Sequence, residues 1–515
     1  GISKYPVITF IFELINSTIG QARWLIIKDY GDGIFNKFVK HLHCLKCSSI
    51  YELSINTYFC PRCGFPLVHE YNVELVKEHI NKEALLRRTT SLIRYGELLP
   101  VNTEVIKELS LGEGFTPLIR CRNLGIHLGI KELYVKYEGL NPTGTFIDRG
   151  SVVGISIPFS LRMPKVVTAG LGDLVVSAST YAVRAGIKPI AVVPQDLNVN
   201  KLNQIKVLGS AVKLVTDYEE ALKKGIELSR RLGYNLIINT SPFMLDGFKT
   251  EGYEIIEQLG YRAPTKLFVP VGDGANIVMV YRGMKEFLEL GIIDELSTKM
   301  IAVQHSPKSL PVPIGRAQRR SLVAKYVREI AIKKPLMHYA VTEVLRESGG
   351  SAVLVNDEDL INAMKLLAKY EGIIVDPLGA SGLAGLVKAL SEGLVSSDDE
   401  VVVLITASPI KHPLFLSDLT RAFSRFEETP LLSETKLAIL EVIMSKGALH
   451  PYGIWRVLKE SMGIDIKPTT VYQHIRDLEE QGLVIKERTD VSGGNIRIIY
   501  RLTDRGVKVL KSIYG

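Results

Sequence analysis

The 515-residue chain lacks the features of a membrane-spanning protein and of a secreted protein held together by disulfides. It has no run of the roughly 18 apolar residues that a membrane helix needs. The longest apolar candidate near its start, residues 7–15, is interrupted by Glu13 and shows no cleavage-site pattern. Four of its only five cysteines occur in closely spaced pairs, which favours a metal site in a reducing compartment over disulfides. We therefore expect a cytoplasmic protein without a membrane segment.

A strong excess of charge of one sign is also absent. Lys and Arg number 63 and Asp and Glu 55, so the net charge is +8, a modest value for this length. Such a charge permits an anionic partner but does not require one. Hydrophobic residues make up 46% and charged residues 23% of the chain, as in a globular protein with sizeable cores. At this length we expect about three or four domains.

The four paired cysteines form a metal-binding motif. They are Cys44, Cys47, Cys60 and Cys63, and twelve residues separate the two CxxC pairs. This spacing lets four thiolates surround one zinc ion in tetrahedral geometry. Because four thiolates leave no open coordination position, the motif predicts a structural zinc ribbon over residues 41–70 rather than a catalytic metal.

Residues 71–425 alternate strand-like and helix-like segments, the pattern of an α/β fold with mostly parallel sheets. Helical patterns include residues 174–185 and 277–290. The strand candidates are residues 165–168, 189–193, 211–215, 267–270, 300–303 and 401–406. Residues 1–40 precede the ribbon as an extension. We expect it to pack on the main domain or on a second subunit.

The segment 134–150, YVKYEGLNPTGTFIDRG, predicts a tight connection from a buried strand to a helix, because its turn contains Pro and Gly. It closely resembles the segment that carries the cofactor lysine in threonine synthases and other fold-type-II pyridoxal-phosphate (PLP) enzymes, roughly K-x-E-G-x-N-P-T-G-S-F-K-D-R-G. Segments 111–118, 246–250 and 371–377 follow in the order of that family. The resemblance implies a two-domain α/β core with parallel sheets. One subgroup of threonine synthases carries a similar N-terminal ribbon.

One position departs from this resemblance in a way that changes the chemistry. Where the family has its Schiff-base lysine, the chain has Ile147. A PLP enzyme of this type needs a primary amine there to hold the cofactor, and a branched hydrocarbon cannot supply one. The alternative is that Lys136 takes over, but its place on a strand between Val135 and Tyr137 predicts that it points elsewhere. We therefore predict no catalytic residue at this site and no covalently bound PLP.

A glycine-containing loop follows a predicted strand and opens a helix. Its residues are Gly272, Asp273, Gly274, Ala275 and Asn276. Backbone N–H groups of such a loop can close around a phosphate at the positive end of the helix. The loop stands where the resembling family grips the cofactor phosphate, so a phosphate compound held without a covalent bond is one expected ligand. A plain strand-to-helix turn is the alternative, and the charge of Asp273 weakens the case for an anion.

A second loop, residues 168–174, has drifted further from the family pattern S-S-G-N-T. Asp173 replaces the family's Asn, which meets the cofactor ring hydroxyl, and Leu171 and Leu174 stand among the positions of substrate-binding hydroxyls. An acidic side chain and leucines do not favour a carboxylate ligand. Thr406 does match the family's partner of the pyridine nitrogen. This loss of several pocket residues at once indicates a pseudoenzyme.

Residues 431–515 show a different pattern: three helices, a hairpin formed by residues 483–485 and 496–500, and a last helix from about residue 503. This is the order of a winged helix-turn-helix domain. The segments PYG at 451–453, TVY at 470–472 and YRLT at 500–503 closely resemble PadR-like transcription regulators.

A recognition helix and a wing both carry residues suited to double-stranded DNA. The helix candidates are Thr469, Thr470, Tyr472, Gln473, His474 and Arg476, and the wing candidates are Lys486, Arg488 and Arg497. Short polar and basic groups read base edges, and wing cations neutralise phosphates. The alternative is a protein-binding or dimerisation module, because Glu479, Glu480 and Glu487 reduce the positive charge of this face.

These patterns lead to one main hypothesis and two rivals. The main hypothesis is a homodimeric DNA-binding regulator whose sensory domain descends from threonine synthase. Its old cofactor cleft binds a small phosphorylated or amino-acid-like effector, or nothing. The first rival is an active PLP-dependent threonine synthase or lyase with an accessory winged helix. The second is a structural or complex-forming protein that uses both domains as contact surfaces.

Overall fold

The computed structural model describes residues 34–305, 332, 335–409, 432–492 and 495–514. The chain divides into two compact units, residues 1–413 and 414–515. Most of the predicted N-terminal extension, residues 1–33, and the predicted junction between domains at 425–431 lie outside the described residues. Within the described ranges, no helix combines the length and apolar character required to cross a bilayer. A cytoplasmic location stays a prediction.

The first unit begins with a small antiparallel sheet. Strand β1 (Val39–Cys44) pairs with β2 (Ile50–Tyr51) on one side and with β3 (Leu67–Tyr71) on the other. Gly64 has a φ of 69°, in the left-handed region that glycine adopts without strain, and it forms the turn after the last cysteine. This three-stranded sheet is the scaffold of the predicted ribbon.

Two further sheets form the α/β part of this unit. The six-stranded sheet has the order β12-β11-β10-β13-β5-β4 and is parallel except for β4, which runs antiparallel to β5. Its strands are β4 (Leu118–Arg120), β5 (Glu132–Tyr137), β10 (Lys266–Pro270), β11 (Lys299–Gln304), β12 (Ser351–Leu354) and β13 (Glu400–Ile405). The four-stranded sheet is parallel, in the order β8-β7-β6-β9. Its strands are β6 (Lys165–Ala169), β7 (Lys188–Pro194), β8 (Ala211–Val215) and β9 (Leu236–Ile237).

Helices connect these strands and cover the sheets. They are α3 (Val73–Lys77), α4 (Lys82–Arg87), η2 (Leu92–Leu98), α5 (Thr103–Leu109), α6 (Arg122–Leu128), η3 (Glu138–Leu140), α7 (Ile147–Ser160), α8 (Gly172–Arg184), α9 (Val199–Val207), α10 (Tyr218–Leu232), α11 (Pro242–Gln258), α12 (Ala275–Glu289), α13 (His338–Glu347), α14 (Asp357–Leu366), η6 (Leu367–Glu371) and α15 (Pro377–Ser391). Helices α7 and α11 are buried along most of their length and pack against each other. Both helices also carry buried polar side chains, among them Arg149 on α7 and Glu254 on α11.

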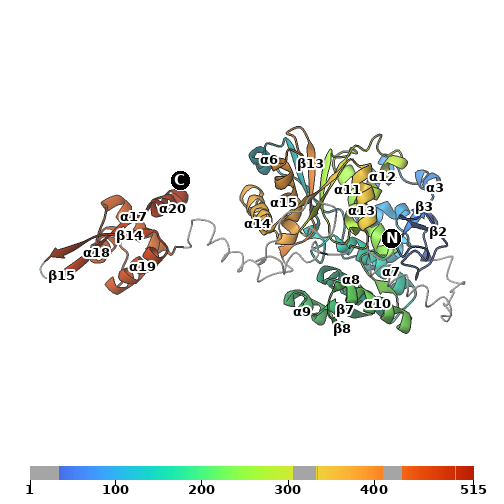
Figure 1. The fold of residues 1–515 in the computed structure, drawn as a ribbon, viewed down its shortest axis with the longest axis horizontal. Helices are drawn as coiled ribbons and strands as arrows, with labels where there is room; N and C mark the ends of the chain where they lie inside the picture. Colours follow the sequence, from blue (N-terminus) through green and yellow to red (C-terminus); the bar gives the residue numbers. More distant parts are fainter. Residues whose placement is uncertain (1–33, 306–331, 333–334, 410–431, 493–494, 515) are drawn as a thin grey trace. The chain divides into compact units, whose positions relative to one another are not determined.

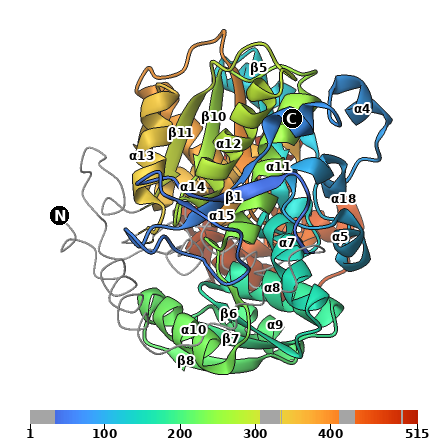
Figure 2. The same ribbon diagram turned by 90° about the vertical axis from the view of Figure 1, so that its right-hand side faces the viewer.

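Figures 1 and 2 show α7 between the two sheets of this unit, with β10 and β11 on one side and β6, β7 and β8 on the other. The central strands are apolar along most of their length and buried, as expected for parallel strands covered on both faces. The predicted α/β core with parallel sheets is confirmed. Each predicted strand and both predicted helices are present with bounds within a few residues of those expected.

The second unit has the predicted order of helices and strands. Its elements are α17 (Glu434–Lys446), α18 (Pro451–Met462), α19 (Pro468–Glu480), β14 (Val484–Ser492), β15 (Asn495–Leu502) and α20 (Asp504–Tyr514). Pro occupies the first turn of α18 and of α19, where its missing N–H has no helical partner to lose. A separate apolar core joins the helices to the hairpin, with Leu440, Ile454 and Ile475 fully or almost fully buried. The fold is therefore a winged helix.

Candidate functional site

A cavity of about 70 Å³ lies in the first unit where several strands of the parallel sheets end. Ligands of open α/β proteins bind in this kind of position, beyond the carboxyl ends of the strands. The lining residues come from the loop before α7, the start of α8, the loop between β10 and α12, and the end of β13. They are Thr145, Phe146, Ile147, Leu171, Asp173, Leu174, Tyr218, Asn239, Pro270, Gly272, Asp273, Gly274, Asn276, Ile332, Leu378 and Thr406.

The cavity brings together the pocket residues that the sequence singled out, although they are spread over more than 250 positions. Asp173, Gly272, Asp273, Gly274, Asn276 and Thr406 all line it, and so does Ile147. Ala275, the first residue of α12, is fully buried and is not among the lining residues. The sequence missed Tyr218 and Asn239, which follow β8 and β9 and show no motif of their own.

Ile147 is the first residue of α7 and is 5% exposed. Its apolar side chain lines the cavity, and no lysine is present among the described lining residues. Lys136 lies elsewhere, as expected, since its Nζ is 2.7 Å from Glu254 Oε2 and 2.7 Å from the Thr116 carbonyl oxygen. Lys136 is therefore not among the lining residues of the cavity.

Asp273 places a carboxylate at the N-terminal end of α12. Its Oδ1 accepts a hydrogen bond from the Ala275 N–H at 3.1 Å, and its Oδ2 accepts one from Asn239 Nδ2 at 3.0 Å. Unpaired N–H groups at a helix start attract anions. Here the chain's own carboxylate occupies one of them. Burial raises the pKa of Asp273, and these hydrogen bonds only partly offset the rise.

Asp173 also carries an acidic group to the cavity, but a cation balances it. Its Oδ1 lies 2.9 Å from Nζ of Lys201, and both side chains are at least 97% buried. The aliphatic part of Lys201 lies so close to Gly172 that any side chain there would clash with it. Sequence reasoning missed Lys201, because this contact joins α8 to α9 and leaves no local signal.

Thr406 follows β13 and faces the cavity. It is 4% exposed, and its Oγ1 has no hydrogen-bond partner among the residues that the structure describes. The backbone next to it holds the turn before α7 in place, because the Phe146 N–H donates to the Thr406 carbonyl oxygen at 3.4 Å. The Ser408 N–H likewise donates to Gly144 at 2.9 Å. Thus the two walls that meet at Ile147 are tied together by main-chain bonds.

The family residues around Ile147 form a buried polar network. The Arg149 guanidinium donates to Glu138 Oε2 at 2.7 Å and to Glu254 Oε2 at 2.6 Å, and all three side chains are fully buried. Lys136 completes this network through Glu254. Burial alone raises the pKa of Glu254, but the charges of Arg149 and Lys136 outweigh it and lower the pKa to about 2. These ion pairs hold α7, α11 and the end of β5 together.

Asp148 has a similar role in the turn. Its Oδ2 accepts the Thr143 N–H at 2.6 Å, and its Oδ1 accepts the hydroxyl of Ser177 at 2.5 Å. Asp148, like Arg149, therefore stabilises the fold around the turn before α7.

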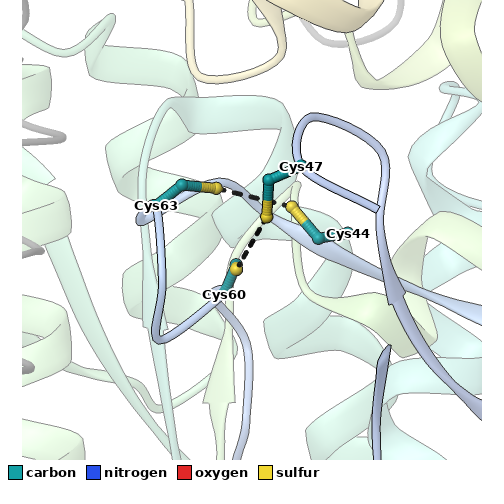
Figure 3. A group of neighbouring side chains, drawn as sticks. All are labelled: Cys44, Cys47, Cys60 and Cys63. Carbon is teal, nitrogen blue, oxygen red and sulfur yellow. Dashed lines mark hydrogen bonds between the residues drawn. The ribbon is translucent and has the colours of Figure 1, made fainter. Parts of the chain in front are cut away.

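The four cysteines of the ribbon converge on one point (Figure 3). Their sulfur atoms all lie within 4.8 Å of one another, with 3.5 Å between Cys44 and Cys63 and 3.6 Å between Cys47 and Cys60. Four thiolates at about 2.3 Å from a tetrahedral zinc ion are about 3.8 Å apart, so this donor set fits zinc. The fifth cysteine, Cys121, is buried outside the cluster.

The ribbon is joined to the α/β part by buried polar contacts. His69 Nδ1 on β3 lies 2.6 Å from Asp246 Oδ2 on α11, and the Tyr71 hydroxyl donates to Asp246 Oδ1 at 3.0 Å. Lys249, also on α11, pairs with Asp246 at 3.0 Å. The ribbon and the α/β part also share one apolar core.

The predicted recognition helix corresponds to α19. Thr469, Tyr472, Gln473 and Arg476 are exposed, whereas Thr470 and His474 are half-buried. Burial and the nearby Lys436 lower the pKa of His474. Gln473 Nε2 donates to Asp477 Oδ1 at 3.0 Å, which holds its amide along the helix.

The predicted wing corresponds to the β14–β15 hairpin. Lys486, Arg488 and Arg497 are exposed on it. Lys486 pairs with Glu479 at 3.7 Å and Arg488 with Asp490 at 3.3 Å. Exposed pairs of this kind contribute little free energy, so both cations can exchange their partner for a phosphate.

Two family models match the chain. The pyridoxal-phosphate dependent enzyme family matches residues 109–407, and the PadR-like family of transcriptional regulators matches residues 439–512. The first match contains the whole lining of the cavity. The second contains most of the winged helix.

Characterised relatives cover the first unit. Threonine synthase of Methanocaldococcus jannaschii is 37% identical over 410 residues, which cover 78% of this chain and 99% of the relative. Threonine synthase of Methanosarcina acetivorans is 33% identical over 416 residues, covering 79% of this chain and 99% of the relative. Both relatives are matched over nearly their full length.

Solved structures agree on the fold. Diaminopropionate ammonia lyase from Escherichia coli superposes with a TM-score of 0.52 at 17% identity, covering 62% of this chain and 91% of that one. At this identity the likeness concerns the fold alone. The chain thus belongs to the pyridoxal-phosphate-dependent enzyme family, has threonine synthases among its relatives, and carries a PadR-like domain at its C-terminal end.

Proposed function

We propose that this chain is a catalytically inactive relative of threonine synthase that regulates transcription by binding double-stranded DNA. The observation that carries the proposal is the combination of Ile147 at the position of the cofactor amine with a PadR-like winged helix. A cavity without this amine cannot hold PLP through a Schiff base, but it can still bind a small molecule. A winged helix converts such binding into a change in DNA affinity.

Three features of the cavity support the view that it does not hold PLP covalently. Ile147 supplies no amine, and Asp273 places a carboxylate at the helix start where the cofactor phosphate belongs. The volume of about 70 Å³ is also far below the roughly 300–1,000 Å³ of ordinary small-molecule sites. These residues do not fit PLP, so we derive no reaction step through it. In this proposal the cleft senses a small phosphorylated or amino-acid-like ligand.

DNA binding would use α19 in the major groove. Thr469, Tyr472, Gln473 and Arg476 face solvent there, and the three wing cations lie on the adjacent hairpin. Helix-turn-helix proteins usually bind as dimers to two half-sites about one helical turn apart. We therefore propose a homodimer whose half-site spacing responds to the ligand in the cleft.

We also propose that the four cysteines bind one structural zinc ion. Four thiolates close the coordination sphere, so this metal would stabilise the ribbon and take no part in chemistry.

Substitution of Arg476 tests the DNA interface. Arg476→Ala should weaken binding to the protein's own promoter by about 5-fold to 150-fold, because an arginine that reads a base contributes about 1–3 kcal/mol. Lys486→Ala should weaken binding to all duplexes alike and lower the salt slope by about one. Fluorescence anisotropy at several salt concentrations measures both effects.

Arg120→Ala is the matched control, since it removes an exposed arginine from the other unit and should leave DNA affinity unchanged. Equal, weak binding of the wild-type protein to every duplex would contradict a specific regulator. Loss of all DNA binding together with a stable protein partner would favour the complex-forming alternative.

One observation favours the rival reading of an active PLP enzyme. Lys201 brings an amine next to the cavity through its contact with Asp173. An enzyme that used this amine would turn yellow with PLP, and borohydride would attach the cofactor to Lys201. We expect neither result, because a buried ion pair with Asp173 holds the amine of Lys201. Peptide mapping by mass spectrometry after reduction decides between the two functions.

Restoring the lysine gives a further prediction. Ile147→Lys should yield at most a coloured, borohydride-reducible PLP adduct, with little turnover of phosphohomoserine or a hydroxy-amino acid. The reason is that Asp173 and Asp273 would still occupy positions of the cofactor and substrate groups. Absorption near 400 nm and product formation are the two measurements, with Ile147→Leu as the control. Efficient turnover by the lysine variant would show that the pocket is catalytically intact.

A further inference from the structure

Asp273 differs from the other acidic residue of the cavity in its partners. The donors to its carboxylate are the backbone N–H of Ala275 and the amide of Asn239, both neutral. Asp173, in contrast, has Lys201. No lysine, arginine or histidine among the described residues forms an ion pair with Asp273, which is 5% exposed. A buried carboxylate without a cation is unfavourable, and a cationic ligand would relieve this cost.

A phosphate ligand meets two obstacles at the same place. The Ala275 N–H at the start of α12 is already bonded to Asp273, so a phosphate would have to displace that carboxylate or lie against it. The loop also has little room to move. Gly274 has a φ of +95°, and a side chain there would meet Val341 at 2.5 Å and Met337 at 3.0 Å, so the loop is packed closely against α13 and the residue before it.

Four more polar atoms of lining residues have no hydrogen-bond partner among the described residues. They are Oδ1 of Asn239, Oγ1 of Thr406, and both Oδ1 and Nδ2 of Asn276, and Thr406 is 96% buried. Because Asn239 donates its Nδ2 to Asp273, its Oδ1 remains an acceptor beside the carboxylate. Two neighbouring oxygen acceptors suit the donors of an ammonium group. The Thr406 hydroxyl can donate to, or accept from, a second polar group of the same ligand.

The remaining wall and the size of the cavity limit the ligand further. Ile147, Leu171 and Leu174 make one side of the cavity apolar. At about 70 Å³ the cavity is well below the roughly 300–1,000 Å³ of ordinary small-molecule sites, which favours a compact ligand. A compact amine or a small amino acid meets these limits, and a phosphorylated metabolite does not.

We propose that the cavity binds a small ammonium-bearing molecule, pairs its cation with Asp273 and Asn239, and excludes phosphate. This inference rests on the proposed sensory function of the cleft. Of the two proposed ligand classes, phosphorylated and amino-acid-like, it selects the amino-acid-like class. In this inference the carboxylate of Asp273 is the group that makes the site bind an ammonium ion instead of a phosphate.

Isothermal titration calorimetry on the full-length protein tests this inference at constant ionic strength. The probes are methylammonium chloride, glycine and L-threonine on one side, and inorganic phosphate and PLP on the other. The wild-type protein should bind at least one ammonium probe and neither phosphate probe. In Asp273→Asn the ammonium affinity should fall at least tenfold, and inorganic phosphate should bind, because the charge is gone.

Asp359→Asn is the matched control, since it makes the same change in the first turn of α14, away from the cavity lining. It should alter neither affinity. If Asp273→Asn does not fold by circular dichroism, Asp273→Ser keeps a capping group without the charge and serves in its place. The inference is overturned if the wild-type protein binds phosphate, if no ammonium probe binds it, or if the uncharged variant retains the ammonium affinity.

The DNA assay separates this inference from the proposed function. A protein that binds its promoter but no ammonium probe overturns the inference alone. A protein that binds an ammonium probe but no DNA overturns the regulatory function alone.

Discussion

Arg149→Met is expected to lower the free energy of unfolding of the first unit by about 3–5 kcal/mol. Arg149 is fully buried and donates to Glu138 and Glu254, which are buried as completely. Methionine fills a similar volume but leaves Lys136 as the one remaining cation of this network. Glu138 then becomes a buried carboxylate without its partner, which is the costly outcome. Guanidinium unfolding followed by circular dichroism measures the change.

Arg120→Met is the control for this prediction. Arg120 also pairs with a glutamate, Glu132, at 2.5 Å, but the two side chains are 49% and 39% exposed. Exposed pairs contribute about 0–1 kcal/mol, so this variant should unfold almost like the wild type. If both substitutions changed the free energy of unfolding equally, the buried ion pairs of Arg149 would not be what stabilises the fold.

Cys60→Ser is expected to abolish zinc binding and to unfold the ribbon. The Cys60 sulfur lies 3.6 Å from that of Cys47 and is fully buried, so a serine leaves three thiolates around the metal. Structural zinc contributes about 10–16 kcal/mol of apparent binding energy in isolated zinc fingers, so the loss is large. Because the ribbon shares a core with the α/β part, the first unit should also become sensitive to protease. Elemental analysis and limited proteolysis measure the two effects.

Cys121→Ser provides the comparison, because Cys121 is buried but lies outside the cluster. It should keep one zinc ion per chain. Absence of zinc from the wild-type protein, or an unchanged stability of Cys60→Ser, would count against a structural zinc site.

The family segment around Ile147 shows what a sequence can and cannot reveal. Its letters predicted the strand, the turn and the start of α7 correctly. They did not reveal that Asp148 and Arg149 are buried partners of residues far along the chain. Both residues therefore stabilise the fold through contacts that do not involve the side chain of Ile147.

The recognition helix gives a second example. The sequence predicted the recognition helix that the structure shows as α19. It did not separate exposed Gln473 from half-buried His474, which follows it directly. Adjacent residues of a helix differ in direction by about 100°, and only the packing of α17 against α19 decides which of them reaches solvent.

The sequence by itself determined the ribbon cysteines, the α/β core, the winged helix and the absence of an amine at position 147. Each of these follows from local spacing or from a single letter. Only the tertiary structure decided that Lys201 neutralises Asp173 while Asp273 has no cation among the described residues. These facts depend on contacts between α8 and α9 and between β9 and α12. The charge of a pocket is the sum over side chains that distant segments bring together, so no local pattern contains it.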